Sequence, residues 1–379
     1  MADSLASRKL KVLIVTALPP WYRGGVERVV GETAKQLVLN QNAEVEIRCG
    51  DLYASQSLVW NGIPVKTYKT TRWQRFASVE MLKEIKRDAK MFDVIHAHGY
   101  HTLSSSLAAA ERGSTPFVFS AHFHPAASSR ALAPVKWIYD RLFNARIFKN
   151  SARIICVSET EKKFIRQRFK LPTDSSIVIP NGVNAGEIAR ANPYKIDYKL
   201  ILSVGRLVKH KQNQLTIEAM KYIPECYRFY MIGNGGYKRK LEVMARKYGL
   251  EARVKVLDSC SDEEVYRWLQ TCAVIVNLSE IEAFGITVLE GLAAGKGVIV
   301  NNKLGLAELA RRFEGAVFPV DREETDSVEL AKIIEDVATK RIDRVDLHEF
   351  RWDRIAQRVL AVYLDIYQSQ RSELALRNV

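Results

Sequence analysis

Short apolar strands alternate with amphipathic helices along this chain of 379 residues, and the alternation occurs twice. The β-branched run from Lys11 to Val15 predicts a strand buried on both faces, and apolar residues at helical spacing from Val26 to Leu37 predict a helix after it. This alternation predicts an α/β fold in which helices cover both faces of a parallel sheet. Further strands are predicted at 93–96, 117–119, 153–157, 199–204, 228–232, 254–257, 273–277 and 297–300. Further helices are predicted at 76–91, 134–148, 214–220, 238–248, 286–295 and 352–369.

The two runs of alternation are separated by a segment without apolar periodicity. Residues 179–197 are rich in Pro, Asn and Gly, and they predict a linker between two domains. Charge divides the chain in the same way, because residues 1–190 carry a net charge of +12 and residues 191–379 carry +2. This asymmetry predicts two domains with different partners. The basic half suits nucleic acid, an anionic membrane or a phosphorylated substrate.

Composition and local sequence exclude several classes of protein. The chain is 47% hydrophobic, which is too much apolar surface for long disorder, and no window of eighteen uncharged apolar residues predicts a spanning helix. The first apolar run ends at Pro19 and Pro20, so we expect a buried strand there and no signal peptide. The five cysteines are far apart, which is typical of free thiols in a reducing cytoplasm. No glycine-rich loop has the spacing of a dinucleotide or P-loop motif, which disfavours NAD and P-loop chemistry.

Two glycines, Gly24 and Gly25, precede the first predicted helix. Residues without a Cβ let a diphosphate approach the backbone, and the helix N-terminus presents N–H groups to it. A plain turn explains the same two residues, and the pair alone favours the turn.

A basic loop follows the strand predicted at 199–204. Gly205 ends the strand, and Arg206, Lys209 and Lys211 come directly after it. Ligands of parallel sheets bind at the carboxyl edge, so these cations suit a diphosphate. A solvated basic loop is the alternative interpretation.

The most specific pattern runs from Glu282 to Glu290. Glu282 precedes Phe284 and Gly285, and the helix expected to begin near Ile286 carries Glu290. The N-terminus of this helix can face a phosphate, while Glu290 can accept two ribose hydroxyls and Glu282 can reach a sugar hydroxyl. The alternative interpretation is an ordinary helix with a capping carboxylate, but it does not explain why Phe284 and Gly285 stand before the helix.

This pattern resembles the Glu, seven residues, Glu signature of the retaining nucleotide-sugar glycosyltransferases of family 4, or glycosyl transferases group 1, which have the GT-B fold. Further motifs of that family occur in its order along nearly the whole chain, at 19–27, 93–98, 120–122, 157–159, 179–183, 205–211, 233–235 and 350–352. The chain departs from the family's pattern at Gln212, Asp258, Gly297 and 304–308. The last three departures concern base and donor specificity more than activity.

The resemblance implies two Rossmann-like domains that face each other across a cleft. An acceptor-side domain is expected at 1–185 and a nucleotide-sugar-binding domain at 195–350, and the C-terminal helix, 355–379, is expected to pack back on the first domain. The implied activity is transfer of a sugar from a UDP- or GDP-type nucleotide sugar to an acceptor, with retention of the anomeric configuration, as in a hexosyltransferase. Neither a cofactor nor a metal is expected.

The resemblance also implies roles for particular residues. Arg206 and Lys211 neutralise the diphosphate leaving group, and Glu290 holds the ribose. Glu282 and His122 hold the transferred sugar. The residues expected to be catalytic are His122, Glu282, Arg206 and Lys211. The residues expected to bind the donor are Gly24, Gly25, Arg206, Lys211, Phe284, Gly285 and Glu290.

Histidines gather in one part of the sequence. Five of the seven lie close together: His96, His98, His101, His122 and His124. Two His-x-His pairs place imidazoles on one strand face, which is a pattern found in metal sites. A metal is disfavoured because no carboxylate or cysteine stands at ligand spacing. Apart from the sugar-binding role implied for His122, these histidines are expected to shape an acceptor pocket or to cap strand ends.

Two rival functions stay open. One is a nucleotide-sugar epimerase or a phosphorylase of the same fold. The other is a basic RNA-binding module, which explains the charge but not the segment from Glu282 to Glu290. The chain also lacks the interleaved aromatic and basic strand of RNA readers, so no nucleic acid is expected.

The acceptor side is strongly basic. Residues 121–170 carry 11 Lys and Arg against 3 Asp and Glu, and 136–149 mixes aromatic and basic residues at helical spacing. This mixture suits a helix on an anionic membrane and a lipid-linked or anionic glycan as the acceptor. A core helix with solvated cations is the alternative. We therefore expect a cytoplasmic protein, either free or peripheral on the inner face of the membrane.

Overall fold

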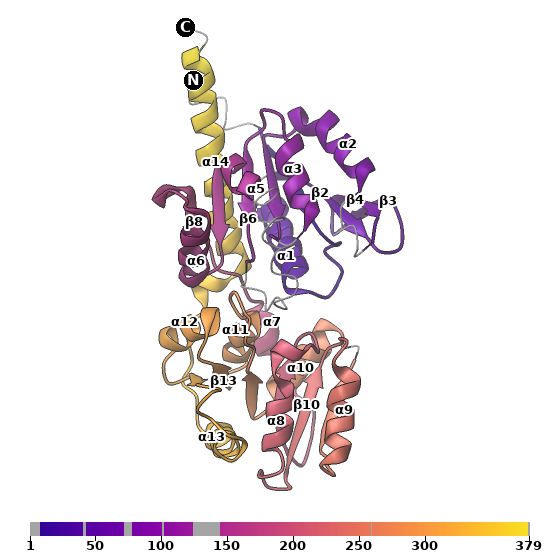
Figure 1. Cartoon of the computed structure of the whole chain (residues 1–379), viewed down its shortest axis with the longest axis vertical. Coiled ribbons are helices and arrows are strands. Elements are labelled where there is room, and N and C mark those ends of the chain that lie inside the picture. Colours follow the sequence, from indigo (N-terminus) through magenta and orange to yellow (C-terminus); the bar gives the residue numbers. More distant parts are fainter. Residues whose placement is uncertain are drawn as a thin grey trace. The chain divides into compact units, whose positions relative to one another are not determined.

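The chain folds into two compact units. The computed structural model describes residues 8–40, 43–71, 78–100, 102–123, 145–258 and 260–377. Residues 1–181 and 352–379 form the first unit, and residues 182–351 form the second (Figure 1). Each unit holds a largely parallel sheet between two layers of helices, so the α/β class with two Rossmann-like sheets is confirmed. No helix in the described ranges has the length and the apolar character needed to cross a bilayer.

The first unit is built on an eight-stranded sheet with the order β3-β4-β2-β1-β5-β6-β7-β8. All neighbouring strands are parallel except the hairpin of β3 and β4. The strands are β1 (Leu10–Thr16), β2 (Ala43–Asp51), β3 (Gln56–Trp60), β4 (Ile63–Lys69), β5 (Val94–His98), β6 (Phe117–Ser120), β7 (Arg153–Cys156) and β8 (Ser176–Val178). The helices are α1 (Gly25–Asn40), α2 (Val79–Asp88), η2 (Ala89–Met91), α3 (Leu103–Glu111), α5 (Ala145–Asn150), α6 (Glu159–Phe169), η5 (Thr173–Ser175) and α14 (Trp352–Arg377).

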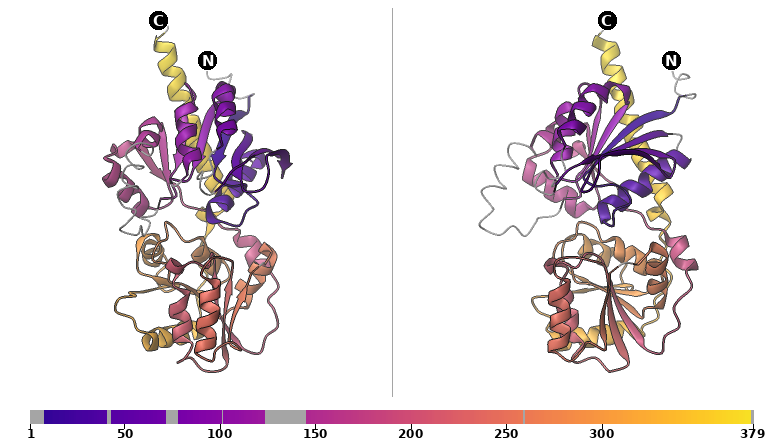
Figure 2. Two further views of the ribbon diagram at one scale, coloured as in Figure 1. Left: turned by 45° about the vertical axis from the view of Figure 1, so that its right-hand side comes forward. Right: turned by 90° about the vertical axis from the view of Figure 1, so that its right-hand side faces the viewer.

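Helices cover both faces of the first sheet (Figure 2). On one face, α2, α3, α5 and α6 share a single apolar core with the strands. Side chains alternate along a strand, so Ile95 and Ala97 of β5 face this core while His96 and His98 face the other side. There α1 and α14 pack against each other, and Tyr363 of α14 reaches His96. The sheet therefore carries an apolar layer on one face and a more polar contact with the C-terminal helix on the other.

The sequence pattern did not predict β2, β3 and β4. Charged residues interrupt the apolar run of β2, yet Arg48 is buried, with Glu46 at 2.6 Å and Asp88 at 2.9 Å from its guanidinium nitrogens. The hairpin of β3 and β4 turns at Asn61 and Gly62, whose φ angles are 50° and 78°. An Asn-Gly pair between short strands is the strongest local signal of a hairpin, and this pair was available in the sequence.

The second unit holds a six-stranded, fully parallel sheet with the order β11-β10-β9-β12-β13-β14. The strands are β9 (Lys199–Val204), β10 (Tyr227–Ile232), β11 (Val254–Leu257), β12 (Val274–Asn277), β13 (Gly297–Asn301) and β14 (Val317–Val320). The helices are α7 (Ala185–Arg190), η6 (Lys209–Lys211), α8 (Asn213–Ala219), α9 (Lys238–Lys247), α10 (Asp262–Thr271), α11 (Ile286–Ala293), α12 (Leu304–Arg312), α13 (Ser327–Thr339) and η7 (His348–Phe350). α8, α9 and α13 share one apolar core with the strands. α11 packs on the opposite face, where a Cβ on Gly291 would lie 2.7 Å from Ile275.

The chain passes between the units at two adjacent points. The segment predicted as a linker, 179–197, contains the short helix α7 and so is not irregular throughout. Beside it, the Val183 amide donates to the Phe350 carbonyl at 2.8 Å. The chain then enters α14 at Trp352, and this helix belongs to the first unit. The sequence placed the domain limits at 185, 195 and 350, and the structure divides the chain after Asn181 and after Arg351.

Candidate active site

Several of the predicted donor-binding residues lie at the carboxyl edge of the second sheet. Gly205 and the exposed Arg206 follow β9, and Lys211 ends η6. Glu282 lies in the loop between β12 and α11. Because β9 and β12 are neighbouring parallel strands, their carboxyl ends meet at one edge. The fold thus brings these basic and acidic residues together.

Lys211 and Glu282 form an ion pair at this edge. Lys211 Nζ lies 2.5 Å from Glu282 Oε2, and the two side chains are 18% and 24% exposed. The aliphatic part of Lys211 passes over Gly205, where an added Cβ would lie 3.7 Å from Lys211 Cε. The ammonium and the carboxylate are therefore held in place before any ligand binds. A diphosphate at this position would compete with Glu282 for the lysine.

Glycines let two loops of the second unit pack backbone against backbone. Gly233 has a φ of 142°, and a Cβ there would lie 2.0 Å from the Gly205 carbonyl oxygen. A Cβ on Gly235 would lie 2.2 Å from the Leu207 carbonyl oxygen. The Leu207 amide donates to the Asn234 carbonyl at 2.8 Å, which joins the loops directly. The loop that carries Arg206 is thus supported along its length.

A second close approach supports the N-terminus of α11. Gly285 precedes the helix with a φ of 101°, and Phe284 beside it is buried. Gly305 of α12 packs on this corner, where a Cβ would lie 2.3 Å from the Ala283 carbonyl oxygen. The Gly305 amide also donates to the Glu282 carbonyl at 3.2 Å. The single glycine retained in the segment 304–308 is therefore the one that this packing requires.

Other predicted positions of the second unit lie nearby in the fold. Glu290 is buried on α11, at the level of its second turn. Gln212, where the family usually has Gly, precedes α8 with a φ of 59°, a conformation that favours glycine. Asp258 follows β11 and forms an ion pair with Lys238 of α9. The departure at Asp258 thus adds a carboxylate that already has a cationic partner.

Two groups of predicted residues belong to the first unit. Gly25 begins α1, and the Arg28 amide donates to the Gly24 carbonyl at 3.0 Å. A Cβ on Gly24 would lie 1.9 Å from Glu27 Oε2, so this glycine leaves room for a carboxylate at the helix N-terminus. His122 follows β6, is partly exposed, and has a φ of 45°. Gly24 and His122 thus lie in loops of the first unit, and Gly25 lies in the first turn of α1.

The structure gives two more of the clustered histidines specific contacts. His96 Nδ1 lies 2.6 Å from the Tyr363 hydroxyl, and His98 Nδ1 lies 3.1 Å from His122 Nε2. Burial lowers the pKa of His96 to about 3 and that of His122 to about 4, and it holds the pKa of His98 well below 6.5. His101 and His124 lie outside the described residues. Within the described ranges, no group of three or more His, Cys, Asp or Glu side chains could hold a metal ion.

A buried carboxyl that the sequence pattern did not predict, that of Glu161, bonds to the backbone next to His122. Glu161 accepts hydrogen bonds from the backbone amides of Phe123 and Val157, the latter at 2.5 Å. Burial raises the pKa of Glu161 to about 8, although both hydrogen bonds oppose the shift. Ser158 accepts from the Glu161 amide as the N-cap of α6. The Ser-x-x-Glu spacing from Ser158 to Glu161 is that of a capping box, and it was the signal available in the sequence. In a capping box the Glu accepts from the N-cap amide, whereas Glu161 accepts from the amides of Val157 and Phe123.

The basic segment 121–170 is only partly described. Residues 124–144, which include most of the aromatic and basic stretch at 136–149, lie outside the described residues. At its end, Ile147 and Phe148 of α5 are buried in the apolar core, while Lys149 is exposed. These two apolar side chains therefore agree with the alternative interpretation of this segment, a helix whose apolar side packs in the core.

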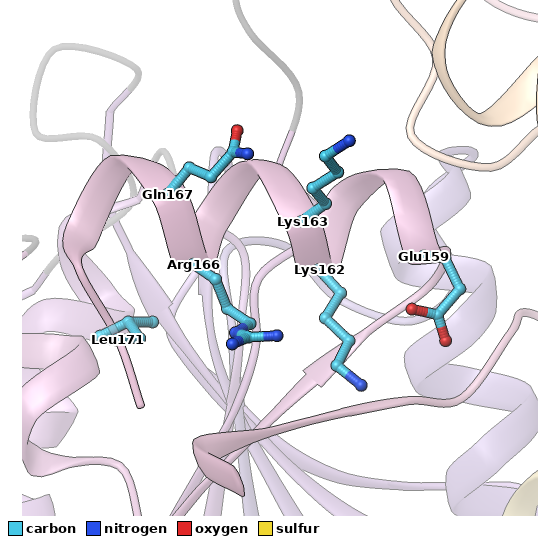
Figure 3. Close-up of a pocket in the computed structure, with 6 residues that line it drawn as sticks. All are labelled: Glu159, Lys162, Lys163, Arg166, Gln167 and Leu171. Atoms are coloured by element: carbon cyan, nitrogen blue, oxygen red, sulfur yellow. The ribbon is translucent and has the colours of Figure 1, made fainter. Parts of the chain in front are cut away.

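A surface pocket lies along α6 of the first unit (Figure 3). It has a volume of about 340 Å³ and is lined by Glu159, Lys162, Lys163, Arg166, Gln167 and Leu171. Lys162 and Arg166 point to the same side of the helix, as Glu159 does at its start (Figure 3). The pocket includes none of the residues predicted from the sequence as catalytic or donor-binding.

Comparison with known families assigns both halves of the chain. The model of the family described as Glycosyltransferase Family 4 matches residues 23–187, and that of Glycosyl transferases group 1 matches residues 185–349. An uncharacterized glycosyltransferase of Methanocaldococcus jannaschii is 26% identical, over 93% of this chain and 98% of that protein. A phosphatidylinositol N-acetylglucosaminyltransferase component from Arabidopsis thaliana is also 26% identical, over 94% of this chain and 82% of that protein.

Solved structures share the fold. The sucrose-phosphate synthase of Thermosynechococcus elongatus has a TM-score of 0.78 at 19% identity, over 95% of this chain and 100% of that chain. Anabaena HepE in complex with UDP-glucose has a TM-score of 0.67 at 19% identity, over 97% of this chain and 99% of that chain. With matches to both family models and two Rossmann-like units, the chain belongs to glycosyltransferase family 4 and has the GT-B fold.

Proposed function

We propose that this glycosyltransferase moves a hexose from a UDP- or GDP-type nucleotide sugar to an acceptor, with retention of the anomeric configuration. The observation that carries the proposal is the ion pair of Lys211 and Glu282, whose charged atoms lie 2.5 Å apart at the carboxyl edge of the second sheet. A cation and a carboxylate held in advance at this edge suit a donor that has a diphosphate at one end and sugar hydroxyls at the other.

The proposed reaction breaks the bond between the anomeric carbon and the diphosphate oxygen. Arg206 and Lys211 stabilise the negative charge that develops on the leaving diphosphate, aided by the amides of Phe284 and Gly285 at the start of α11. The acceptor hydroxyl attacks from the face that the diphosphate leaves, and its proton passes to a diphosphate oxygen. No metal and no cofactor take part in this scheme.

The remaining roles follow the match to the family's motif. Glu290 holds the ribose, and Glu282 and His122 hold the transferred sugar. Gly24 and Gly25 lie against the donor, at the N-terminus of α1. A donor of the uridine type is supported by Anabaena HepE, a protein of similar fold whose solved structure contains UDP-glucose.

We propose an anionic acceptor, either a lipid-linked sugar or a charged glycan. The first 190 residues carry a net charge of +12, and Lys162 and Arg166 line one pocket on α6. Two relatives have anionic inositol compounds in their names, the phosphatidylinositol N-acetylglucosaminyltransferase component from Arabidopsis thaliana and a D-inositol 3-phosphate glycosyltransferase of Xylanimonas cellulosilytica. These features favour a cytoplasmic enzyme that is peripheral on the inner face of a membrane.

The donor can be identified by thermal unfolding in the presence of single nucleotide sugars. A ligand that binds only the folded protein raises Tm, and a concentration one hundred times its Kd adds about 2.7 kcal/mol of stability. We expect one UDP- or GDP-sugar to raise Tm more than the others. With that donor, release of nucleotide diphosphate should require acceptor. Conversion of the donor without any acceptor would instead indicate an epimerase.

Two matched variants test the division of roles between the glutamates. Glu290→Gln should weaken binding of the bare nucleotide diphosphate, because an amide is a poorer acceptor than a carboxylate for two hydroxyls. Glu282→Gln should leave that binding intact or make it tighter, because Lys211 loses its competing partner. Calorimetry with UDP and GDP measures both variants. Equal losses in the two would contradict the assigned roles.

A further inference from the structure

Polar side chains connect the C-terminal helix to the histidines of the first sheet. The Tyr363 hydroxyl of α14 lies 2.6 Å from His96 Nδ1, and Ser120 Oγ of β6 lies 2.8 Å from His96 Nε2. All three residues are buried. Because hydroxyl groups can donate or accept, both nitrogens of a neutral His96 are satisfied in either tautomer. His96 is thereby held in one position by groups that come from β6 and α14.

His98 lies between His96 and His122. His96 and His98 are two residues apart on β5, and their ring centroids are 4.1 Å apart. His98 stacks on His122 with an interplanar angle of 19°, and His98 Nδ1 lies 3.1 Å from His122 Nε2. The order from helix to loop is therefore Tyr363, His96, His98 and His122. The first three are buried, and His122 is partly exposed.

The backbone of His122 is restrained from the other side. His122 has a φ of 45°, a left-handed conformation that is uncommon for residues with a side chain. The next amide, that of Phe123, donates to the buried carboxyl of Glu161. The side chain of His122 is thus held by His98, and its main chain is held by Glu161.

We propose that His98 is a positioning residue for His122: the single proton shared by His98 Nδ1 and His122 Nε2 sets the tautomer of His122. The tilted ring contact with His96, whose Nδ1 lies against the Tyr363 hydroxyl, holds His98 in place. This inference rests on the proposed contact between His122 and the transferred sugar. Only one of the two facing nitrogens can carry the proton, since two N–H groups would repel and two lone pairs would form no bond. The pKa of both rings is lowered by burial, which keeps them neutral and the sharing intact.

The arrangement determines what His122 can offer a ligand. Its Nε2 is occupied by His98, so a sugar hydroxyl would meet Nδ1 or the backbone. If His98 donates, Nδ1 of His122 carries a proton and donates to the sugar. If His122 donates, Nδ1 is an acceptor. In either tautomer, His122 Nδ1 has one fixed role toward the sugar, as donor or as acceptor. Loss of His98 would leave the His122 ring free to exchange between the two tautomers.

Nitrogen NMR of the full chain labelled with ¹⁵N-histidine reads the tautomer directly and needs no substrate. The His122 signals are assigned by their absence in His122→Asn. We expect wild-type His122 to show one protonated and one unprotonated nitrogen, with little averaging and a pKa well below 6.5. In His98→Leu the two nitrogen shifts of His122 should average, because the ring can then exchange between its two tautomers. In His98→Asn the side-chain amide can replace His98 Nδ1 as the hydrogen-bond partner of His122. This variant should therefore restore part of the difference between the two nitrogen shifts of His122.

Controls separate positioning from a general loss of structure. His348→Asn, which changes an exposed histidine of the second unit, should leave the His122 signals unchanged. Tyr363→Phe removes one hydroxyl without changing the ring, and it should broaden the His122 signals even where His98→Leu fails to fold. His122 shifts that are the same in wild type and in folded variants of His98 and Tyr363 would overturn the proposal.

Turnover measured on the same variants tests the proposed function separately. We expect His98→Leu to lower kcat about tenfold or more with little change in the KM of the nucleotide sugar, since the donor's diphosphate contacts are intact. If the tautomer changes as expected while kcat does not, the positioning of His122 stands and its proposed contact with the transferred sugar is wrong.

Discussion

At the scale of single residues, the candidate site is defined by charges that are held before a ligand arrives. The ion pair of Lys211 and Glu282 is partly exposed, so its contribution to folding stability is small. In the proposed reaction its importance is positional, because preorganised charges need no reorganisation when charge develops on the leaving diphosphate. Arg206, on the same supported loop, is exposed.

Removing the lysine charge should affect turnover far more than folding. Lys211→Ala is expected to lower turnover by about two powers of ten, the usual cost of losing one preorganised group that stabilises developing charge. Lys247→Ala is the matched control, because Lys247 is an exposed cation at the end of α9, and it should retain most of the activity. Steady-state kinetics with the identified donor and acceptor measures both. Similar turnover of Lys211→Ala and wild type would contradict the proposed contact between Lys211 and the diphosphate.

At the scale of elements, backbone contacts between loops decide the shape of the site. Gly233 and Gly235 let the loop after β10 touch the loop after β9, and Gly305 lets α12 touch the corner before α11. A side chain at any of these positions would meet main-chain atoms, which cannot move aside as a flexible side chain can. These loops are thus held against each other by residues that contribute no chemical group.

A methyl group at one of these contacts should therefore destabilise the second unit. Gly233→Ala places a Cβ 2.0 Å from the Gly205 carbonyl oxygen at a φ of 142°, and we expect a loss of at least about 2 kcal/mol in the free energy of unfolding. In Gly236→Ala, the control in the same loop, the Cβ meets no atom within 4 Å. Urea unfolding compares the two, and equal midpoints would show that the loops are not in contact.

At the scale of the whole molecule, buried titratable groups couple stability to pH. His96, His98 and His122 have lowered pKa values, so below pH 6.5 the unfolded chain binds protons that the folded chain does not. Each such histidine lowers stability by about 1.4 kcal/mol per pH unit as the pH falls toward its folded pKa. Glu161 acts in the opposite direction, because its folded pKa is raised from 4.5 to about 8 and its contribution is lost as pH rises between those values.

These opposing terms predict a maximum of stability near pH 6.5. Below pH 6.5 the combined effect of the three histidines exceeds that of Glu161. Between pH 6.5 and 8, among these four groups, only Glu161 changes its contribution to stability. Thermal unfolding followed from pH 4.5 to pH 8 should show this maximum, and His96→Asn should reduce the slope on its acidic side. His348→Asn should keep the wild-type slope. A stability that rises steadily from pH 6.5 to pH 8 would contradict the role of Glu161.

Charge on the first unit should also control membrane binding. Each cation near an anionic surface adds about 1 kcal/mol, so Lys162→Glu combined with Arg166→Glu should weaken binding to vesicles with anionic lipid about tenfold or more. Lys247→Glu with Lys332→Glu changes the charge equally on exposed helix positions of the second unit and should have little effect. Co-sedimentation measures the binding, which should be weak on neutral vesicles and lost at high salt. Salt-insensitive binding, or none at low salt, would favour a soluble acceptor.

Features that depend on neighbours along the chain could be predicted from the sequence. Continuous apolar runs gave β1, β9 and β10, because a strand buried on both faces needs no polar residue. The motif from Glu282 to Glu290 and the glycines at 24, 205 and 285 indicated the family, since a phosphate-binding turn imposes its requirements on adjacent residues.

Features that depend on partners far away in the sequence could not be predicted, because they arise when whole elements pack together. Arg48 is buried in β2 because Asp88 comes to it from α2, and no local pattern shows that a charge will be compensated. The contact of His96 with Tyr363 joins residues 267 positions apart, and it exists because α14 returns to the first unit. Glu161 likewise meets Phe123 from another element. Such pairings arise from the packing of whole elements, which a single sequence does not display.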